Sequence, residues 1–461
     1  MAPLAHVGGL GDVSRWLPAT LSQAGDDVRV FLPRYDALET AGRVESVVPG
    51  LEELNLGGLG TAAIHTLDGP GPAVLLVDTP AWFTGGIYAQ GPDEHLRYAA
   101  FCAAVLTACD AMDWVPDVLH ANDWHTALLP LHADARGGHW PGVPVVLTIH
   151  NLAYQGWLPQ SDLELMGVDP SHAAIEAQAR GVNSLGAGIR AADVVTTVSP
   201  TYAGEILTPQ HGEGLDEVLH ANQHKLVGIL NGIGEEWNPS TDPYLPVTYG
   251  ANTLDSKAES AAALRDRLGL THRSRVPILG LVSRLATQKG FDLFRLTLPP
   301  LLDAGRVQLA VLGTGDPPLE AMFSSFANAF PSDAGYHAGF DPELAHLVEA
   351  GADIFLMPSQ REPCGLNQMY SQRYGTVPVV HRTGGLADTV TQWDPVSGNG
   401  TGFLFEHHSD DGFSAALSAA LTAFGDVEAW RLLQRNGMAK DFSWARRAGE
   451  YRETYEQAIA G

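Results

Sequence analysis

Residues 354–370, Ile-Phe-Leu-Met-Pro-Ser-Gln-Arg-Glu-Pro-Cys-Gly-Leu-Asn-Gln-Met-Tyr, carry the pattern that decides the fold. Four apolar residues come first, a polar loop with Pro and Gly follows, and a stretch without helix breakers comes last. A short apolar run before such a loop is typical of a parallel strand that is buried on both faces, and the last stretch is typical of a helix. These residues therefore predict one β-α unit of a doubly wound sheet.

The same alternation of apolar runs and helix-forming stretches continues along the whole chain. In the first half, strands are expected at Val28–Leu32, Ala73–Val77, Asp117–His120, Val143–His150, Val194–Ser199 and Val227–Leu230. In the second half, they are expected at Ile278–Ser283, Val307–Leu312, Ile354–Pro358, Val377–His381 and Phe403–Phe405. Strands that alternate with helices indicate parallel βαβ units, so we predict an α/β protein with doubly wound, Rossmann-like domains.

The length of 461 residues is too great for one hydrophobic core and indicates two domains. A turn with nearby prolines follows the last strand of the first half and places the boundary near residue 240. Trp444, Tyr451 and Tyr455 repeat at roughly helical spacing near the end of the chain. We therefore predict domains at residues 1–240 and 241–440, and a terminal helix at 441–461 that crosses back to the first domain.

The composition argues against several kinds of partner. The 53 acidic and 27 basic residues give a formal net charge of −26, which opposes binding to nucleic acid or to an anionic membrane. Three widely spaced cysteines, Cys102, Cys109 and Cys364, form no disulfide framework. Apolar segments are no longer than a strand, and the N-terminus has no basic run before an apolar stretch. We expect a soluble, cytoplasmic protein in which a few placed cations hold any anionic substrate.

Polar residues follow two expected strands of the first half, at the carboxyl ends where parallel sheets bind ligands. One loop contains His120, Asp123 and His125, and the other contains His150 and Asn151. Asp123 and His150 are predicted to act on a ligand, whereas His120 and His125 are equally well explained as solvated loop residues. The His-x-x-Asp-x-His grouping could suggest a metal site, but it lacks a closed ligand set with recognised spacing, so we predict no metal.

Three loops of the second half carry groups that suit a phosphorylated ligand. Arg284 and Lys289 follow one strand and can converge on a diphosphate, with a surface charge pair as the alternative. Glu362 is predicted in a tight turn at a helix start, where a simple interaction with the helix dipole is the alternative. Gly384 and Gly385 open a further helix and predict a cradle of backbone amides for an anion.

The N-terminal stretch His6-Val-Gly-Gly-Leu-Gly-Asp-Val13 has the glycines of a phosphate-binding turn. Apolar residues at helical spacing after the turn predict a helix that ends at Gly25. Such a turn usually follows a buried strand, and five residues precede His6. We expect a start site farther upstream that supplies this strand, because its loss exposes the interior of the sheet.

Nine blocks in order resemble the bacterial glycogen synthases and the plant starch synthases. They are HVGGLGDV (6–13), HANDWHTALLP (120–130), TIHNLAYQG (148–156), ADVVTTVSPTYAGEI (192–206), LNGI (230–233), SRLATQKGFDL (283–293), PCGLNQMYSQRYGTVPVV (363–380), RTGGLADTV (382–390) and WARRAGEYRETY (444–455). The resemblance spans nearly the whole chain. It implies the GT-B fold, with two Rossmann-like domains that face a cleft, and a retaining glycosyltransferase that needs no metal or other cofactor.

The resemblance also implies substrates and residue roles. The donor would be ADP-glucose, and the acceptor would be the non-reducing end of an α-1,4-glucan. Arg284 and Lys289 would hold the diphosphate, Glu362 would bind the glucose hydroxyls, and His150 and Asp123 would line the sugar site. Phe340 looks like the aromatic residue that stacks on adenine. Further substrate contacts are implied for His6, Gly8, Gly9, Asp12, Tyr88, Asn151, Asn231, Cys364, Gly365, Leu366, Thr383, Gly384, Gly385 and Asp388.

The chain departs from the family pattern at charged positions. The family usually has lysine at the positions of His6 and Gly186, arginine at that of Gln360 and aspartate at that of Gly234. An alternative is therefore a glucan-binding or regulatory protein on a synthase scaffold, with weakened or absent transfer activity. A phosphorylase is a third possibility, but it would need a lysine-bound pyridoxal group, which the small number of lysines disfavours.

Overall fold

The computed structural model describes residues 1–4, 8–36, 38, 42–84, 86, 87, 91 and 93–461. The chain divides into two compact units: unit 1 is Met1–Gly232 with Trp444–Gly461, and unit 2 is Ile233–Ser443. Residues 233–240, predicted to close the first domain, belong to unit 2. The reason is that Ile233 forms a β-bridge with Ser443, and its N–H donates to the Phe442 carbonyl at 2.9 Å.

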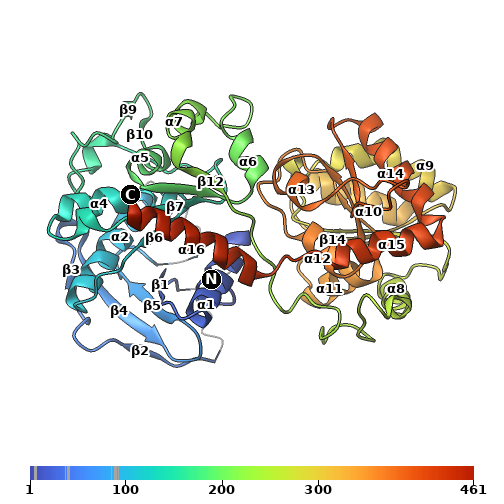
Figure 1. Ribbon diagram of the computed structural model, residues 1–461, viewed down its shortest axis with the longest axis horizontal. Helices are drawn as coiled ribbons and strands as arrows, with labels where there is room; N and C mark the ends of the chain where they lie inside the picture. The colour runs from blue at the N-terminus through green and yellow to red at the C-terminus, as the bar shows by residue number, and fades with distance from the viewer. Residues whose placement is uncertain (5–7, 37, 39–41, 85, 88–90, 92) are drawn as a thin grey trace. The chain divides into compact units, whose positions relative to one another are not determined.

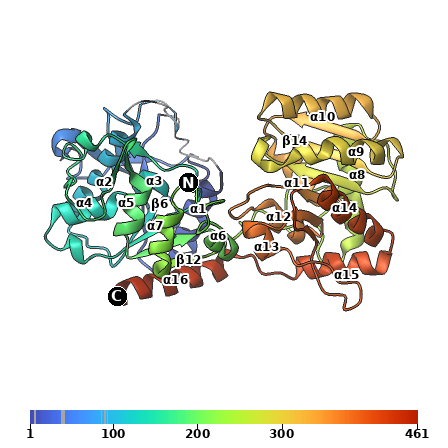
Figure 2. The same ribbon diagram turned by 90° about the horizontal axis from the view of Figure 1, so that it is seen from above.

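Unit 2 is a six-stranded parallel sheet with helices on both faces (Figures 1 and 2). Its strands are β13 (Ile278–Val282), β14 (Gln308–Gly313), β15 (Ala334–Ala338), β16 (Ile354–Met357), β17 (Val377–His381) and β18 (Phe403–Phe405). Its helices are α8 (Lys257–Leu268), α9 (Phe294–Asp303), α10 (Pro317–Ala329), α11 (Pro342–Gly351), α12 (Asn367–Arg373), α13 (Gly384–Thr389), α14 (Asp410–Phe424) and α15 (Val427–Met438). The order β15-β14-β13-β16-β17-β18 is that of a doubly wound domain, in which strand order reverses between β13 and β16.

Alternate residues of these strands face opposite sides of the sheet. Leu279 and Leu356 belong to the apolar cluster that α9, α10 and α14 cover, whereas Ile278 and Phe355 belong to the cluster that α8 and α11 cover. Because both faces are buried, the strands appear in the sequence as continuous apolar runs. This is why the strands of unit 2 were predicted well, with β15 as the exception.

Unit 1 contains parallel and antiparallel strands (Figure 1). Its strands are β1 (Arg29–Pro33), β2 (Glu45–Val47), β3 (Leu54–Asn55), β4 (Thr61–Leu67), β5 (Ala73–Asp78), β6 (Leu119–Asn122), β7 (Val145–Ile149), β8 (Trp157–Leu158), β9 (Ala177–Gln178), β10 (Gly181–Asn183), β11 (Val194–Thr197) and β12 (Leu226–Gly228). One sheet has the order β1-β5-β4-β2, with β3 on β4, and another is the parallel sheet β12-β11-β7-β6. The antiparallel pairing of β4 with β2, β3 and β5 was not predicted.

The helices of unit 1 are α1 (Gly8–Gln23), α2 (Glu94–Ala111), α3 (Asp123–Thr126), α4 (Leu129–Arg136), α5 (Ser184–Ala191), α6 (Pro200–Glu205), α7 (Asp216–Ala221) and α16 (Trp444–Ala460). The glycine turn opens α1, as predicted, and Val13 and Leu17 of α1 pack with Trp444 and Tyr451 of α16. The terminal helix therefore returns to unit 1, and both views show it there (Figures 1 and 2). The described part of the chain contains no helix that is long and apolar enough to cross a membrane.

Candidate active site

The candidate site of unit 2 lies where strand order reverses. β13 and β16 are neighbours, and the loops after them carry Arg284, Lys289 and Glu362. In open parallel sheets, ligands bind beyond the carboxyl ends of the strands at such a reversal. The pairing of β13 with β16 therefore brings together two segments that lie about seventy residues apart in the sequence.

Lys289 and Glu362 form an ion pair between these loops. The Lys289 Nζ atom lies 2.6 Å from Oε2 of Glu362, and the Ser359 hydroxyl donates to the same oxygen at 2.9 Å. The loops are also joined through their backbones, because the Gln360 N–H donates to the Gln288 carbonyl at 2.8 Å. Gly290 has a φ of +72°, and a Cβ on it would lie 2.0 Å from the Pro358 carbonyl oxygen. Glycine at this position thus permits the close approach that places Lys289 on Glu362.

Both ends of the ion pair keep capacity for a ligand. Glu362 is buried, and no described residue donates a hydrogen bond to its Oε1. A lysine ammonium has three N–H donors, so the contact with Glu362 leaves two. Arg284 is exposed and makes no ion pair with any described carboxylate. The two cations predicted to hold a diphosphate therefore lie on the loop that faces the Glu362 turn.

The turn that contains Glu362 differs from the prediction. Helix α12 begins at Asn367, five residues beyond Glu362, so the carboxylate does not lie in a first helical turn. Gly365 has a φ of +72°, and Leu366 is the N-cap residue. Cys364 is buried as a free thiol. Glu362 is thus held by Lys289 and Ser359 rather than by the amides of a helix start.

The glycines at the start of α13 pack tightly on the Glu362 turn. A Cβ on Gly384 would lie 2.1 Å from the Glu362 carbonyl oxygen, and one on Gly385 would lie 2.0 Å from the Cys364 carbonyl oxygen. The Gly385 N–H donates to the carbonyls of Glu362 and Pro363 at 3.1 and 3.2 Å. A phosphate that binds the Gly385 N–H would have to displace these two carbonyls. The role of this amide in phosphate binding therefore stays a prediction.

Three further residues predicted in unit 2 differ in exposure. Thr383 is buried and is the N-cap residue of α13, whereas Asp388 of the same helix is exposed. Phe340, in the loop after β15, is 85% exposed. Such a large apolar side chain in water is available for stacking on a flat ligand.

In unit 1, Asp123 organises the loop after β7. Its Oδ1 accepts the N–H of His150 at 2.7 Å and that of Asn151 at 3.3 Å. The Nε2 atom of His150 lies 2.9 Å from Oδ1 of Asn122, so β6 and α3 position both the backbone and the ring of His150. Asp123 has a φ of +55°, a left-handed conformation that few non-glycine residues adopt.

Burial shifts the pKa values of these groups. It raises the pKa of Asp123, against the lowering effect of His125 and of the two backbone N–H donors. It also lowers the pKa of His150 to about 4. The His150 ring is therefore neutral near pH 7, and one ring nitrogen can accept a hydrogen bond while the other donates.

His120 and His125, for which the sequence did not decide between a ligand role and a solvated loop, both contact other side chains. Nδ1 of His120 lies 2.8 Å from the Tyr455 hydroxyl, and its Nε2 lies 2.6 Å from the Thr148 hydroxyl. The His125 ring stacks on Trp124 at 4.4 Å between centroids. His120 thus links α16 to the sheet. No three His, Cys, Asp or Glu side chains of the described residues are placed to hold a metal ion.

The glycine turn lies beside a buried amide side chain. A Cβ on Gly9 would lie 3.9 Å from Nδ2 of Asn231, and Oδ1 of Asn231 accepts no hydrogen bond from the described residues. Gly8 is exposed with a φ of +63°, and Asp12 is half-buried on α1. Asn231 can therefore accept a donor from a ligand at this turn. The predicted contacts of His6 and Tyr88 lie outside the described residues.

A cavity of about 480 Å³ in unit 1 was not predicted from the sequence. It is lined by Gly91, Glu94, His95, Trp124, Ala153, Tyr154, Gln155, Gly156, Trp157, Arg180 and Glu213. Trp124 follows Asp123 directly, and the loop 153–157 follows His150 and Asn151, so the cavity adjoins these site residues. Aromatic rings next to carboxylates suit a ligand with both apolar faces and hydroxyl groups. Tyr154 and Trp157, which follow His150 closely in the sequence, were the sequence feature from which this cavity could have been predicted.

Comparison with known proteins gives the class of protein that carries this site. The family "Starch synthase catalytic domain" matches residues 1–221, and "Glycosyl transferases group 1" matches residues 265–429. The catalytic domain of starch synthase IV from Arabidopsis thaliana, bound to ADP and acarbose, has a TM-score of 0.90 and 33% identity, and the match covers 100% of this chain and 98% of that one. Sucrose-phosphate synthase from Thermosynechococcus elongatus, at 17% identity over 100% and 96% of the two chains with a TM-score of 0.62, shows the fold alone. The fold and these matches define a glycosyltransferase of the GT-B type.

The curated relatives give the family. Glycogen synthase from Rhodospirillum rubrum is 42% identical, over 100% of this chain and 97% of the relative. Glycogen synthase from Anaeromyxobacter dehalogenans is 43% identical, over 100% and 98%. The chain belongs to the glycogen and starch synthase family and is a glycogen synthase type of glycosyltransferase. These relatives do not favour the regulatory alternative.

Proposed function

We propose that this chain transfers glucose from ADP-glucose to the non-reducing end of an α-1,4-glucan, with retention of configuration. The observation that supports the proposal most directly is the pairing of Lys289 with Glu362 at the reversal of strand order in unit 2, on the loop that also carries the exposed Arg284. The similar starch synthase IV structure was bound to ADP and acarbose, which supports ADP as the nucleotide.

On the donor side, the reaction needs positive charge where the leaving group departs. Negative charge builds on the phosphate of ADP as the bond to glucose breaks, and fixed cations stabilise that charge. Lys289 keeps two N–H donors for the phosphate, and Arg284 offers a planar guanidinium. The Oε1 atom of Glu362 would accept a glucose hydroxyl, so one ion pair would orient both the sugar and the leaving group.

On the acceptor side, unit 1 would receive the glucan in the cavity lined by Trp124, Tyr154 and Trp157. The flat faces of glucose rings pack on aromatic rings, and Glu94 and Glu213 would accept sugar hydroxyls. The neutral His150, with its backbone N–H held by Asp123, would present its carbonyl or ring to the transferred glucose. The roles of all these residues are part of the proposal.

Release of ADP tests the proposal. Purified protein is incubated with ADP-glucose and glycogen, with UDP-glucose in parallel, and the nucleoside diphosphate is measured. We expect ADP release by the wild-type chain and by Glu428→Ala, an exposed glutamate of α15, and a loss of about 100-fold or more in Glu362→Ala. Equal release by Glu362→Ala and wild type, or none by either, would contradict transfer. Glycogen binding without ADP release would favour the regulatory alternative.

A further inference from the structure

The loop that carries Glu362 begins with two buried residues. Pro358 and Ser359 directly follow the last residue of β16, and both are buried. Neither of their carbonyls accepts a backbone N–H from the described loops and turns. Because a buried backbone carbonyl without a donor costs free energy, each of these groups needs a side chain as its partner.

Two histidine side chains supply these partners. Nε2 of His408 lies 2.9 Å from the Pro358 carbonyl oxygen, and Nδ1 of His381 lies 2.9 Å from the Ser359 carbonyl oxygen. A carbonyl oxygen only accepts, so in both contacts the ring nitrogen carries the hydrogen. His381 therefore donates through Nδ1, and His408 donates through Nε2.

The two histidines come from strands that follow β16 in the sheet order β13-β16-β17-β18. His381 is the last residue of β17, and His408 lies between β18 and α14. The His381 ring packs on Phe405, the last residue of β18, at 5.2 Å between centroids. Ser409 caps α14 by accepting the Gly412 N–H at 3.1 Å, which fixes the backbone next to His408. Both rings are thus held by the fold of unit 2.

The His408 contact lies against the loop that carries Lys289. A Cβ on Gly290 would lie 2.0 Å from the Pro358 carbonyl oxygen and 2.4 Å from Nε2 of His408. Gly290, the Pro358 carbonyl and the His408 ring therefore pack directly on one another. A shift of this carbonyl would move Gly290 and, with it, the preceding residue Lys289.

The His381 contact acts on the residue that holds Glu362. The Ser359 hydroxyl donates to Oε2 of Glu362 at 2.9 Å, the oxygen that also contacts Lys289. The bond from His381 fixes the Ser359 backbone and thereby the position of this hydroxyl. Each histidine thus supports one partner of the ion pair.

We propose that His381 and His408 are positioning residues of the donor site, which hold the ion pair of Lys289 and Glu362 in place through the Pro358 and Ser359 carbonyls. This inference rests on the proposed function, which assigns the ion pair to the sugar nucleotide. Both histidines act through the backbone and need not touch the substrate. A displacement of about 1 Å can cost a factor of about 100 in rate, so support of this kind affects transfer.

Amide side chains test the proposal, because they distinguish the two ring nitrogens. The amide nitrogen of asparagine lies as many bonds from Cα as Nδ1 of histidine does, and that of glutamine lies as many bonds away as Nε2. His381→Asn and His408→Gln are therefore matched variants, which keep the N–H donor in place. His381→Gln and His408→Asn are mismatched variants, which carry the same group at the wrong distance.

Initial rates of transfer from ADP-glucose to glycogen give the first measurement. We expect the matched variants to keep kcat/KM for ADP-glucose within about threefold of wild type, and the mismatched variants to lose about tenfold or more. The KM for glycogen should stay unchanged in all four variants, because the cavity proposed for the glucan belongs to unit 1.

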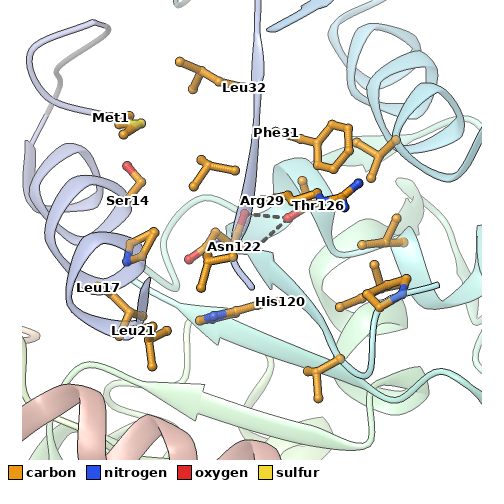
Figure 3. A pocket seen from close by; sticks show the side chains of 18 of the residues that line it. Met1, Ser14, Leu17, Leu21, Arg29, Phe31, Leu32, His120, Asn122 and Thr126 are labelled. Carbon is orange, nitrogen blue, oxygen red and sulfur yellow. Dashed lines mark hydrogen bonds between the residues drawn. The ribbon is translucent and has the colours of Figure 1, made fainter. Parts of the chain in front are cut away.

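Phe31→Ala is the control for a loss of stability alone. Phe31 of β1 lines a cavity of about 620 Å³ in unit 1 (Figure 3), whereas both histidines belong to unit 2. The variant should lower the unfolding temperature but keep kcat/KM within about twofold of wild type at 25 °C. A loss of kcat/KM as large as in the mismatched variants would reduce the histidines to a role in stability and overturn the proposal.

Hydrogen exchange of the Gln360 amide tests the positioning without any substrate. This N–H donates to the Gln288 carbonyl at 2.8 Å and so joins the two loops. We expect exchange about tenfold or more faster in the mismatched variants than in the matched ones. Equal exchange, or equal kcat/KM, of the two amide variants at either histidine would overturn the proposal. If wild type released no ADP while exchange still differed, the proposed function would fail and the positioning of the loop by the histidines would stand.

Discussion

Substitutions of Asp123 can separate the effect of its side-chain acceptor from the effect of its left-handed backbone conformation. Its Oδ1 accepts two backbone N–H groups of the His150 loop, and its backbone has a φ of +55°. Asparagine keeps an acceptor oxygen and tolerates the left-handed region, glycine keeps the conformation without the acceptor, and alanine loses both. We expect the stability of the loop to fall in the order Asp123→Asn, Asp123→Gly, Asp123→Ala.

The magnitudes follow from the geometry. A buried N–H that loses its acceptor costs about 1–3 kcal/mol, and the 3.3 Å bond to Asn151 is weaker than the 2.7 Å bond to His150, so both together cost about 2–4 kcal/mol. The left-handed conformation adds roughly 1–2 kcal/mol for alanine. Asparagine loses mainly the charge on the acceptor, about 1 kcal/mol, because burial already penalises the Asp123 carboxylate.

Hydrogen exchange of the His150 and Asn151 amides measures these costs directly. A free energy of 1.4 kcal/mol is tenfold in local opening, so exchange should rise about fivefold for asparagine and about a hundredfold or more for alanine. Asp113 is the control, because it is exposed with a φ of +51°. Its glycine and alanine variants should differ by the conformational cost alone. Faster exchange in Asp123→Gly than in Asp123→Ala, or equal exchange in Asp123→Asn and Asp123→Ala, would refute this reasoning.

Further predictions concern the ligand contacts and the response to pH. Lys289→Ala should lower kcat/KM for the sugar nucleotide by about 10²–10³, and unchanged kinetics would remove this lysine from the site. Phe340→Ala should weaken ADP binding, measured by calorimetry, by about 1–3 kcal/mol because stacking on the base is lost. Tyr154→Ala should raise only the KM for glycogen, measured from initial rates. The reverse pattern would contradict both assignments. Burial lowers the pKa of His132 from 6.5 to about 4. Between these two pH values the folded protein therefore binds fewer protons than the unfolded chain. The free energy of unfolding should fall as the pH falls through this range. His132→Phe should flatten that pH dependence by up to about 1.4 kcal/mol per pH unit, and an unchanged slope would show that His132 does not titrate on unfolding.

Burial determines which strands the sequence could reveal. The strand β16 is covered on both faces and appears as Ile-Phe-Leu-Met, so its apolar run predicted it almost to the residue. β4, Thr-Ala-Ala-Ile-His-Thr-Leu, has several half-buried positions and pairs antiparallel, and it was missed. β15, Ala-Gly-Tyr-His-Ala, has no apolar run and was also missed. Its position is set by pairing with β14, a tertiary contact that local propensity does not record.

The sequence identified the site residues one by one but did not show which of them lie close together. Arg284, Lys289 and Glu362 were singled out because each follows a predicted strand. Their proximity depends on β13 and β16 being neighbours in the sheet, and the order of strands in a sheet cannot be predicted from local sequence. Similarly, the sequence marked Asp123 as functional, but its action on the His150 backbone follows from the adjacent positions of β6 and β7.

Gly186 and Gly234, two positions where the sequence departs from the expected family pattern, each lie close to a charged side chain. A Cβ on Gly186 would lie 3.5 Å from Nη1 of Arg190, but this guanidinium pairs with the Glu176 carboxylate, so it does not replace the free charge of a lysine. A Cβ on Gly234 would lie 2.1 Å from Oε2 of Glu236, so a carboxylate fills the space of the family's aspartate. At Gly234 the nearby Glu236 carboxylate means that the glycine does not by itself argue for a weakened enzyme, whereas at Gly186 the positive charge is not replaced.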